Sequence, residues 1–285
     1  MIRDYIQLTK PGILRSNLLA AFAGFWLASA WSVDLVLLAL TLLGTLLVMA
    51  SSCVFNNFLD RDLDIKMART RNRALPAGRL PAKHVLIYGG VLGALGLLVL
   101  LLGTNPLSAL LGAAGMFVYV VLYTMWLKRS STLSTVIGAF SGAMPPVIGY
   151  TAVSGTMDTG AWLLFAVMFL WQPPHFWALG IRRIDDYRAA GFRILPVVKG
   201  IRRTKIQMIP YVALLIPATA LFYYRHYTGI IYSVVGVLMS AIWLAHCIAG
   251  LWTKNEQGWA KFSFLYSVNY LVVTFLVMIA NTAGR

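Results

Sequence analysis

The chain has 285 residues, of which 59% are hydrophobic and only 12% are charged, and its mean hydropathy is +0.75. This composition excludes an ordinary soluble globular domain, which is far less apolar. The formal net charge of +15 would suggest a nucleic-acid partner in a soluble protein. In an apolar chain, positive residues instead follow membrane topology, so we expect a lipid-embedded protein that binds no nucleic acid.

Nine stretches, taken in chain order, are long and apolar enough to cross a bilayer, which takes about 20 residues. They are 12–31, 35–56, 84–103, 107–127, 133–153, 160–180, 207–224, 229–251 and 262–281. No low-complexity segment or soluble domain interrupts them. We therefore predict an all-α polytopic membrane protein with nine transmembrane helices, in which residues 1–285 form a single domain.

Lys and Arg residues alternate between the two sides of these spans. The N-terminal segment and the loops after the second, fourth, sixth and eighth spans hold 22 of the 24. Arg225 and Arg285 are the other two. Because positive residues accumulate on the cytoplasmic side, we predict a cytoplasmic N-terminus and an opposite C-terminus. The expected location is the cell inner membrane.

Two spans contain paired prolines, Pro145-Pro146 in the fifth and Pro173-Pro174 in the sixth. Proline removes a helix hydrogen bond, so both spans are expected to be broken at membrane depth. Such breaks are tolerated where the freed carbonyls are covered by protein or line a cavity. A simple packing kink is the alternative.

Two connections, 57–83 and 181–205, are long and strongly charged, and long loops tend to carry function. Together they hold five of the nine acidic residues. Both are predicted to be cytoplasmic from the distribution of positive charge. The functional chemistry of the protein is therefore expected at this membrane face.

The first of these loops begins with a repeat of oxygen-bearing side chains, because Asn56, Asp60 and Asp64 recur at every fourth residue. If the helix continues, the three side chains stack on one face. Magnesium takes oxygen ligands and is usually bound by one or two carboxylates plus substrate phosphates. Bases that can bind phosphate oxygens follow at once, namely Lys66, Arg69, Arg71 and Arg73. The pattern predicts a magnesium-diphosphate site.

The alternative is that these acids pair with the neighbouring bases on a solvated face at the membrane surface, and that the bases only set topology. The four-residue spacing with Asn56 at its head favours the metal site.

The second loop offers another acidic pair, Asp185-Asp186, followed by Tyr187. Arg183 and Lys199 add positive charge and are further candidates for binding a diphosphate. His175 lies deeper, in the sixth span, where an ionisable residue suggests a functional site, although a neutral buried histidine bonded to a carbonyl is the alternative.

Several segments together closely resemble the protohaem IX farnesyltransferase (haem O synthase) family of the intramembrane aromatic prenyltransferase superfamily. The Asn-x-x-x-Asp-x-x-x-Asp motif identifies the superfamily, and the segments Met144–Tyr150 and Leu195–Gly200 point to its haem branch. The segments are Thr9–Gly12, Cys53–Asp62, Lys66-Met67, Arg69-Thr70, Met144–Tyr150, Trp171–His175, Asp186-Tyr187 and Leu195–Gly200.

The resemblance implies nine helices around a central cavity that opens at the cytoplasmic face. It implies transfer of a farnesyl group from farnesyl diphosphate to a vinyl group of haem B, giving haem O for haem-copper terminal oxidases. Expected partners are a haem A synthase or a terminal oxidase. The implied metal ligands are Asn56, Asp60 and Asp64, the implied phosphate ligands are Arg69 and Arg73, and the catalytic candidates are Asp60, Asp64, Asp186 and Tyr187. His175 is a candidate for contacting haem iron or a propionate.

One departure concerns the second acidic motif. Many superfamily members have a second Asp-x-x-x-Asp, but here Arg182 lies four residues before Asp186 and Ala190 four residues after it. The sequence therefore lacks the second acidic motif through which a second magnesium would be held in the usual way. Two alternative functions remain, a quinone-precursor polyprenyltransferase of the same superfamily and a non-enzymatic transporter or haem-handling protein.

Overall fold

The computed structural model describes residues 1–284, which form helices and turns with one isolated β-bridge between Thr228 and Thr282. The all-α prediction is confirmed. The elements are α1 (Ile2–Leu8), α2 (Pro11–Ser29), α3 (Leu35–Leu59), α4 (Arg61–Asp64), α5 (Ala82–Gly103), α6 (Pro106–Phe117), the π-helix η1 (Val118–Leu127), α7 (Lys128–Ser130), α8 (Ser134–Gly142), α9 (Met144–Ser154), α10 (Thr159–Arg182), α11 (Ile184–Ala189), α12 (Leu195–Tyr224), α13 (Ile230–Ala249), the 3-10 helix η2 (Gly250–Trp252) and α14 (Glu256–Ala280).

Eight helical segments among residues 1–284 are long and apolar enough to cross a membrane. They correspond to eight of the predicted spans, with α6, η1 and α7 forming one segment and α8 and α9 another. The predicted span at 12–31 corresponds to α2, which has 19 residues and is not one of the eight. The count of nine and the cytoplasmic N-terminus therefore stay predictions.

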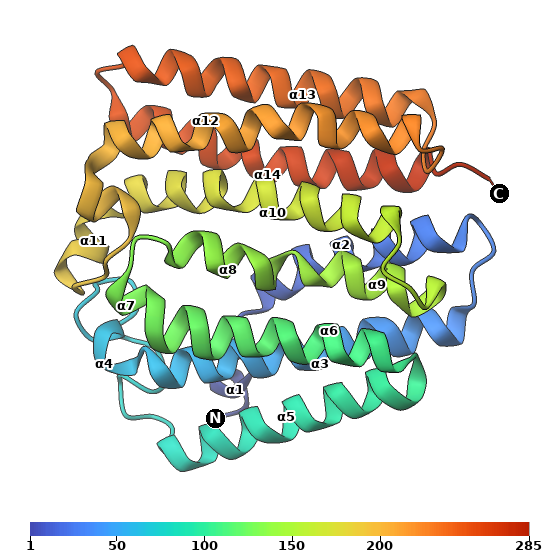
Figure 1. Cartoon of the computed structure of the whole chain (residues 1–285). Helices are drawn as coiled ribbons and strands as arrows, with labels where there is room; N and C mark the ends of the chain where they lie inside the picture. The colour runs from blue at the N-terminus through green and yellow to red at the C-terminus, as the bar shows by residue number, and fades with distance from the viewer. Residues whose placement is uncertain (285) are drawn as a thin grey trace.

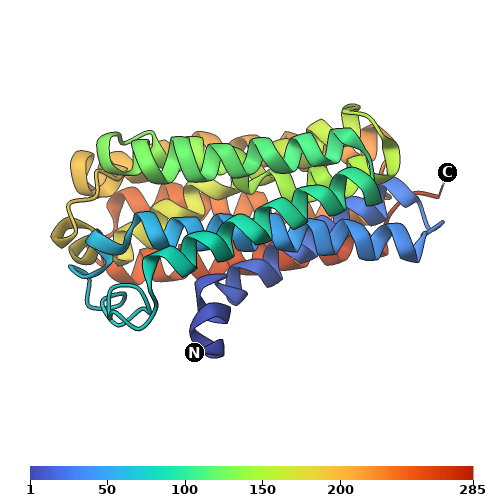
Figure 2. The same cartoon turned by 90° about the horizontal axis from the view of Figure 1, so that it is seen from below.

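The long helices run side by side, and their short connecting helices gather at one end of the bundle. Figure 1 shows α4, α7 and α11 together at the left of the view. We call residues 60–81, 128–133 and 183–200 the loop end. Figure 2 shows α1 standing off the bundle. A hydrogen-bonded ion pair of 2.9 Å between Arg79 and Asp4 ties α1 to the loop end and holds the pKa of Asp4 below its usual value.

Two acidic residues outside the loop end are used to begin helices. The carboxylate of Asp34 accepts hydrogen bonds from the N–H groups of Val36 and Leu37 at the start of α3, at 2.9 and 3.0 Å. Asp158 accepts in the same way from Gly160 at the start of α10, at 2.8 Å. Such caps satisfy N–H groups that have no partner within the helix.

Two spans form the centre of the bundle. The apolar windows of Ser134–Ser154 and Thr159–Arg182 are 61% and 67% buried, whereas the other six are 22–39% buried. Helix α2 packs on α9, and α10 contacts both α12 and α14. The outer helices expose large apolar side chains such as Leu102 and Leu110, as expected for surfaces that face lipid.

Helices α2 and α9 cross at glycines on both partners. A Cβ added at Gly24 would lie 1.9 Å from the carbonyl oxygen of Pro146, and one added at Gly149 would lie 1.9 Å from that of Ala21. Small residues of this kind let two membrane helices approach closely. The crossing therefore depends on having no side chain at either glycine.

The fifth predicted span is broken, as expected, but the sixth is not. Helix α8 ends at Gly142 and α9 begins at Met144, so Pro145 and Pro146 occupy the first turn of α9, where N–H groups need no intrahelical partner. In contrast, α10 continues through Pro173 and Pro174 to Arg182. The expected break there is wrong, because the fixed φ of proline is compatible with a helix and only its missing donor disturbs one.

Part of the second predicted loop is also helical. Residues 184–189 form α11, and α12 begins at Leu195 with a kink at Gly200, whose φ is 79°. The connection between α10 and α12 is therefore shorter than 181–205. The fourth predicted span changes from α-helix to π-helix at Val118.

Candidate active site

The chain remains helical in its hydrogen bonding across the end of α3. The N–H of Asp60 donates to the carbonyl of Asn56 at 3.0 Å, and that of Asp64 donates to the carbonyl of Asp60 at 2.8 Å. Residues four apart therefore stay on one face, as predicted. The side chains of Asn56, Asp60 and Asp64 are all buried, which the sequence pattern did not require.

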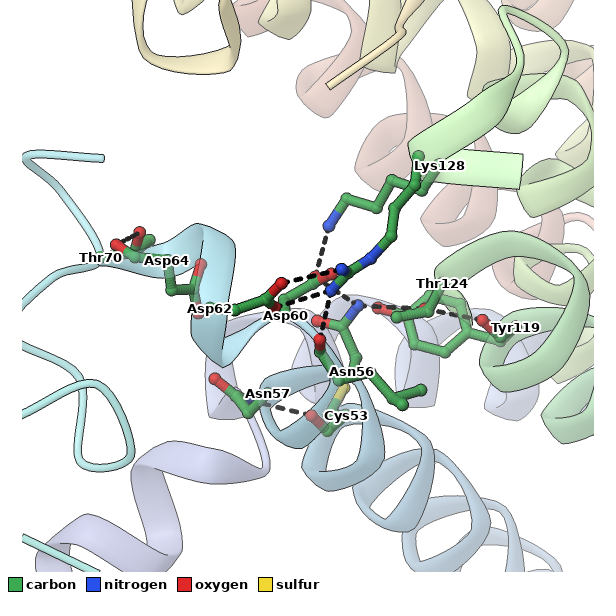
Figure 3. A network of polar contacts seen from close by, with 12 residues as sticks. Cys53, Asn56, Asn57, Asp60, Asp62, Asp64, Thr70, Tyr119, Thr124 and Lys128 are labelled. Carbon is green, nitrogen blue, oxygen red and sulfur yellow. Dashed lines mark hydrogen bonds and ion pairs between the residues drawn. The ribbon is translucent and has the colours of Figure 1, made fainter. Parts of the chain in front are cut away.

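Asp60 lies at the centre of a polar network at the loop end, between Asn56 and Lys128 (Figure 3). Its Oδ2 accepts a hydrogen bond from Nδ2 of Asn56 at 3.0 Å and lies 2.5 Å from Nζ of Lys128. Its Oδ1 is buried and accepts no hydrogen bond from any group in residues 1–284. One oxygen of this carboxylate is therefore available to a ligand.

Two lysines bring positive charge to this carboxylate from distant segments. Nζ of Lys128 lies 4.4 Å from the ring centroid of Phe192 and 5.8 Å from that of Tyr123, and such rings attract a cation. Lys10, just before α2, donates to Oδ1 of Asn56. Burial of its ammonium group, together with the nearby cations, lowers the pKa of Lys10 to about 8.

Asp64 has its own cationic partner. Nη1 of Arg73 lies 2.7 Å from Oδ2 of Asp64, and the hydroxyl of Thr70 donates to the carbonyl of Asp64 at 2.9 Å. Asp62, two residues earlier, is exposed and pairs instead with Arg129 at 2.8 Å. Only the acids spaced by four residues are buried in the network.

The π-helix η1 places a hydroxyl beside the same network. Thr124 is fully buried, donates to the carbonyl of Tyr119 at 2.8 Å and accepts from Nδ2 of Asn56 at 3.1 Å. Both N–H groups of the Asn56 amide are thereby used, since the other donates to Asp60. This fixes Oδ1 of Asn56 toward Lys10.

A mainly apolar cavity of about 400 Å³ lies inside the bundle next to this network. Lys128 and Tyr187 line it at the loop end, and His175 and Gln172 line it from α10. The apolar and aromatic lining comes from α2, α3, α6, η1, α8, α9, α10 and α14, and includes Ile13, Val48, Met116, Tyr119, Ile148, Met168, Trp171, Phe264 and Leu271.

His175 is held at the wall of this cavity by α14. Its Nδ1 lies 2.6 Å from the hydroxyl of Ser267. Its ring stacks on Trp171 and Phe264, with centroid distances of 4.5 and 4.8 Å. The alternative of a histidine bonded to a carbonyl is therefore wrong for its Nδ1.

Other predicted residues lie at the loop end without entering the network. Lys66, Arg69 and Arg183 are exposed, and Asp186 is half-buried. Lys199 is exposed and lines a second pocket of about 460 Å³ between α8, α10 and α12. The functional roles predicted for these residues stay predictions.

Three residues of the network were missed from the sequence, namely Lys10, Thr124 and Lys128. From the sequence, Lys128 is only a marker of topology, and Lys10 is such a marker and part of the segment Thr9–Gly12, so neither is given a role in the site. Thr124 is an unremarkable residue in an apolar span. Lys128 and Asp60 are 68 positions apart, so no local periodicity links them. One sequence feature could have indicated them. Lys10 precedes the span 12–31 and Lys128 follows the span 107–127, and both lie on the side of the membrane predicted for the acidic loops.

The donor set fits magnesium bound together with a phosphate group. The buried Oδ1 of Asp60 has no partner in the described chain, and a buried carboxylate oxygen left without one is unfavourable. Across residues 1–284 no three His, Cys, Asp or Glu side chains form a metal-binding group. Two carboxylates and an amide leave coordination positions to water and phosphate oxygens, which is how magnesium is usually bound.

Comparisons with solved structures show the fold. The chain superposes on a digeranylgeranylglyceryl phosphate synthase with a TM-score of 0.81 at 17% identity, covering 98% of this chain and 97% of that one. A UbiA homologue from Archaeoglobus fulgidus, solved with GPP and Mg²⁺, gives a TM-score of 0.72 at 17% identity, covering 96% and 99%.

Comparisons with curated sequences show the family. The chain is 47% identical to a protoheme IX farnesyltransferase of Alkalihalophilus pseudofirmus, over 97% of this chain and 89% of the relative. It is 47% identical to protoheme IX farnesyltransferase 1 of Bacillus subtilis, over 99% and 91%. One from Acinetobacter baumannii is 46% identical over 97% and 94%. The model of the UbiA prenyltransferase family matches residues 17–268, and the chain therefore belongs to the UbiA prenyltransferase family.

Proposed function

We propose that this protein transfers a farnesyl group from farnesyl diphosphate to a vinyl group of haem B, giving haem O. The observation that carries the proposal is a buried carboxylate, Asp60, with one oxygen free and Lys128 on the other, beside an apolar cavity. The names of its relatives supply the donor and the acceptor, because those proteins are protoheme IX farnesyltransferases at 46–47% identity.

The donor diphosphate binds at the loop end in this proposal. Asn56, Asp60 and Asp64 would hold magnesium, and the chemistry that the bound ion supplies is neutralisation of the diphosphate charge. Lys10, Arg73 and Lys128 place three cations around the same residues, where they attract phosphate oxygens and stabilise the leaving group. A structure of the same fold was solved with GPP and Mg²⁺ bound, which supports a metal-diphosphate site in this proposal.

The apolar cavity receives the farnesyl chain and excludes water from the reacting carbon. Breaking the allylic C–O bond releases diphosphate with the bonding electron pair and leaves a farnesyl cation. The electron pair of the haem vinyl group then forms the new C–C bond. Water adds to the resulting cation and releases one proton, which leaves the hydroxyethylfarnesyl side chain. Tyr187 lines the cavity beside Lys128 and is the candidate nearest to the donor for handling that proton.

The cellular setting follows from the charge distribution and the product. The loop end alone carries 12 of the 24 Lys and Arg residues, which supports a cytoplasmic active site in a multi-pass protein of the inner membrane. Haem O would pass to a haem A synthase or directly to a haem-copper terminal oxidase.

The proposal is tested with membranes that contain the protein, supplied with haem B, farnesyl diphosphate and magnesium. Haem O should form and be detected by mass spectrometry, with stoichiometric release of diphosphate. Prenylated 4-hydroxybenzoate in place of haem O would assign the protein to the quinone branch. Absence of acceptor-dependent diphosphate release would contradict any transferase and favour a transporter or haem-handling protein.

A further inference from the structure

The hydrogen bonds of Ser267 determine how the ring of His175 is protonated. The hydroxyl of Ser267 lies 2.6 Å from the carbonyl oxygen of Phe264 and 2.6 Å from Nδ1 of His175. A serine hydroxyl has one proton, and a carbonyl oxygen can only accept. That proton is therefore donated to Phe264, and Ser267 accepts from His175.

The neutral ring of His175 consequently carries its proton on Nδ1 and a lone pair on Nε2. No group within residues 1–284 hydrogen-bonds to Nε2, and His175 forms part of the cavity lining. Stacking on Trp171 and Phe264 restrains the plane of the ring. The structure therefore presents an oriented imidazole with an unused lone pair at the wall of a cavity.

An imidazole of this kind matches the usual arrangement of a histidine that binds a transition metal. Such histidines almost always donate the other ring N–H to a neighbouring acceptor, which fixes the tautomer and the ring orientation. Ser267 and its bond to Phe264 provide that acceptor here. The only transition metal in the reaction proposed above is the iron of the acceptor haem.

We propose that Nε2 of His175 is an axial ligand of the acceptor's haem iron, and that Ser267 is its positioning residue. The inference rests on the proposed function for the identity of the acceptor. A bond from iron to His175 fixes the porphyrin by its centre. The vinyl groups at its edge are then held at a set distance from α10, in the same cavity that Lys128 lines at the donor end.

Other side chains that can bind iron are less suitably placed. His246 stacks on Trp259, directs its Nε2 toward the Trp259 carbonyl at 3.3 Å, and is not part of the cavity lining. Cys53 lines the cavity but lies on α3 one turn before Asn56, beside the residues assigned to the diphosphate. Met168 lines the cavity, but its side chain is packed in the apolar core of the bundle.

The first test measures iron ligation without catalysis. The purified full-length protein in lipid nanodiscs is titrated with ferric haem, with no farnesyl diphosphate or magnesium present. The wild type should give the Soret and visible bands of histidine-ligated haem. His175→Ala should lose these bands and bind haem more weakly by at least the roughly 10–100-fold that is typical of losing a ligand's hydrogen-bond partner, whereas His246→Ala should resemble the wild type.

Metal-free protoporphyrin IX separates ligation from folding, because it has the same shape but no iron. Its affinity should be the same for the wild type and His175→Ala. Added imidazole should restore the ligated spectrum to His175→Gly. An unchanged spectrum in His175→Ala, or an equal loss of affinity for haem and for the metal-free porphyrin, would overturn the proposal.

The positioning role is tested with two serines one turn apart on α14. Ser267→Ala should shift the bands of bound haem and lower haem affinity, without changing affinity for metal-free protoporphyrin IX. Ser263→Ala should do neither. The hydroxyl of Ser263 accepts a hydrogen bond of 3.1 Å from Nε1 of Trp243, and Ser263 is not part of the cavity lining. Identical spectra for Ser267→Ala and Ser263→Ala would remove Ser267 from the proposal.

A haem O assay on the same preparations keeps the two hypotheses apart. Histidine-ligated haem without any haem O formation would contradict the proposed function alone. Haem O formation by a wild type that never shows histidine ligation would contradict this inference alone.

Discussion

Nζ of Lys128 and Oδ2 of Asp60 lie 2.5 Å apart, although the two residues are 68 positions apart in the sequence. The side chain of Lys128 is 13% exposed and that of Asp60 is 2% exposed, so the pair is almost removed from water. The pair joins the end of η1 to the end of α3, and each of the two buried charges neutralises the other. Changes to either partner should therefore affect both folding and activity.

Replacing Lys128 with Met should leave the Asp60 carboxylate buried without a cation. Breaking a buried pair in this way destabilises a protein by about 3–5 kcal/mol, whereas removing both charges is often nearly neutral. Lys128→Met should lower the thermal unfolding temperature in detergent, and Lys128→Met with Asp60→Asn should recover most of the loss. A double variant less stable than Lys128→Met would contradict this explanation. Both variants should be inactive.

Replacing Asp60 or Asp64 with Asn should lower farnesyl transfer by about 10²-fold or more, because charge stabilisation of the leaving group is lost. Asp62→Asn is the matched control, since Asp62 is exposed and pairs with Arg129. It should retain nearly full activity. Excess EDTA should abolish wild-type activity and added magnesium should restore it, and full activity in EDTA would remove the metal from the proposal.

Removing the hydroxyl of Thr124 should cost about the free energy of one buried hydrogen bond. Thr124→Val keeps the shape but leaves one N–H of Asn56 without an acceptor, which costs about 1–3 kcal/mol. We expect kcat/KM for farnesyl diphosphate to fall by roughly tenfold or more, and Thr124→Ser to restore most of it. Equal activity of Thr124→Val and the wild type would show that Asn56 is positioned without η1.

The crossing of α2 and α9 should not tolerate a methyl group at either glycine. Gly149→Ala would place its Cβ 1.9 Å from a backbone oxygen that cannot move alone, so we expect a loss of about 1–3 kcal/mol or more. Gly90→Ala on α5 is the control, because a Cβ there meets no atom within 4 Å. It should be neutral or stabilise by about 0.5–1 kcal/mol. Thermal unfolding in detergent compares the two.

Hydropathy predicted most of the fold because spanning a bilayer imposes a length and a composition that can be recognised one segment at a time. It could not predict features that depend on neighbouring helices. The predicted charged loop 181–205 ends at Lys205, yet this lysine is 1% exposed, pairs with Glu256 and donates to the carbonyl of Gly250 at 2.7 Å. The continuous helix through Pro173 and Pro174 is another such feature.

In the candidate site, too, the sequence predicted the local features and missed those that depend on distant segments. The spacing of Asn56, Asp60 and Asp64 is a local property, and the structure keeps it. The cations are non-local, since Lys10 reaches Asn56 from 46 positions away. A basic residue next to a span has the same sequence signature whether it orients the protein in the membrane or binds an acid, so topology alone explained Lys128 until its partner was known.

The order of the site residues along the chain has a consequence for biosynthesis. Lys10, Asn56, Asp60 and Lys128 all lie in the first 128 residues, so the half of the site that we propose for the diphosphate can assemble while the ribosome is still translating the later helices. Ser267 lies in α14, the last helix, and only its arrival completes the wall that holds His175. A nascent chain can therefore form the charged network of the proposed donor site before α14 completes the wall of the cavity proposed for the acceptor.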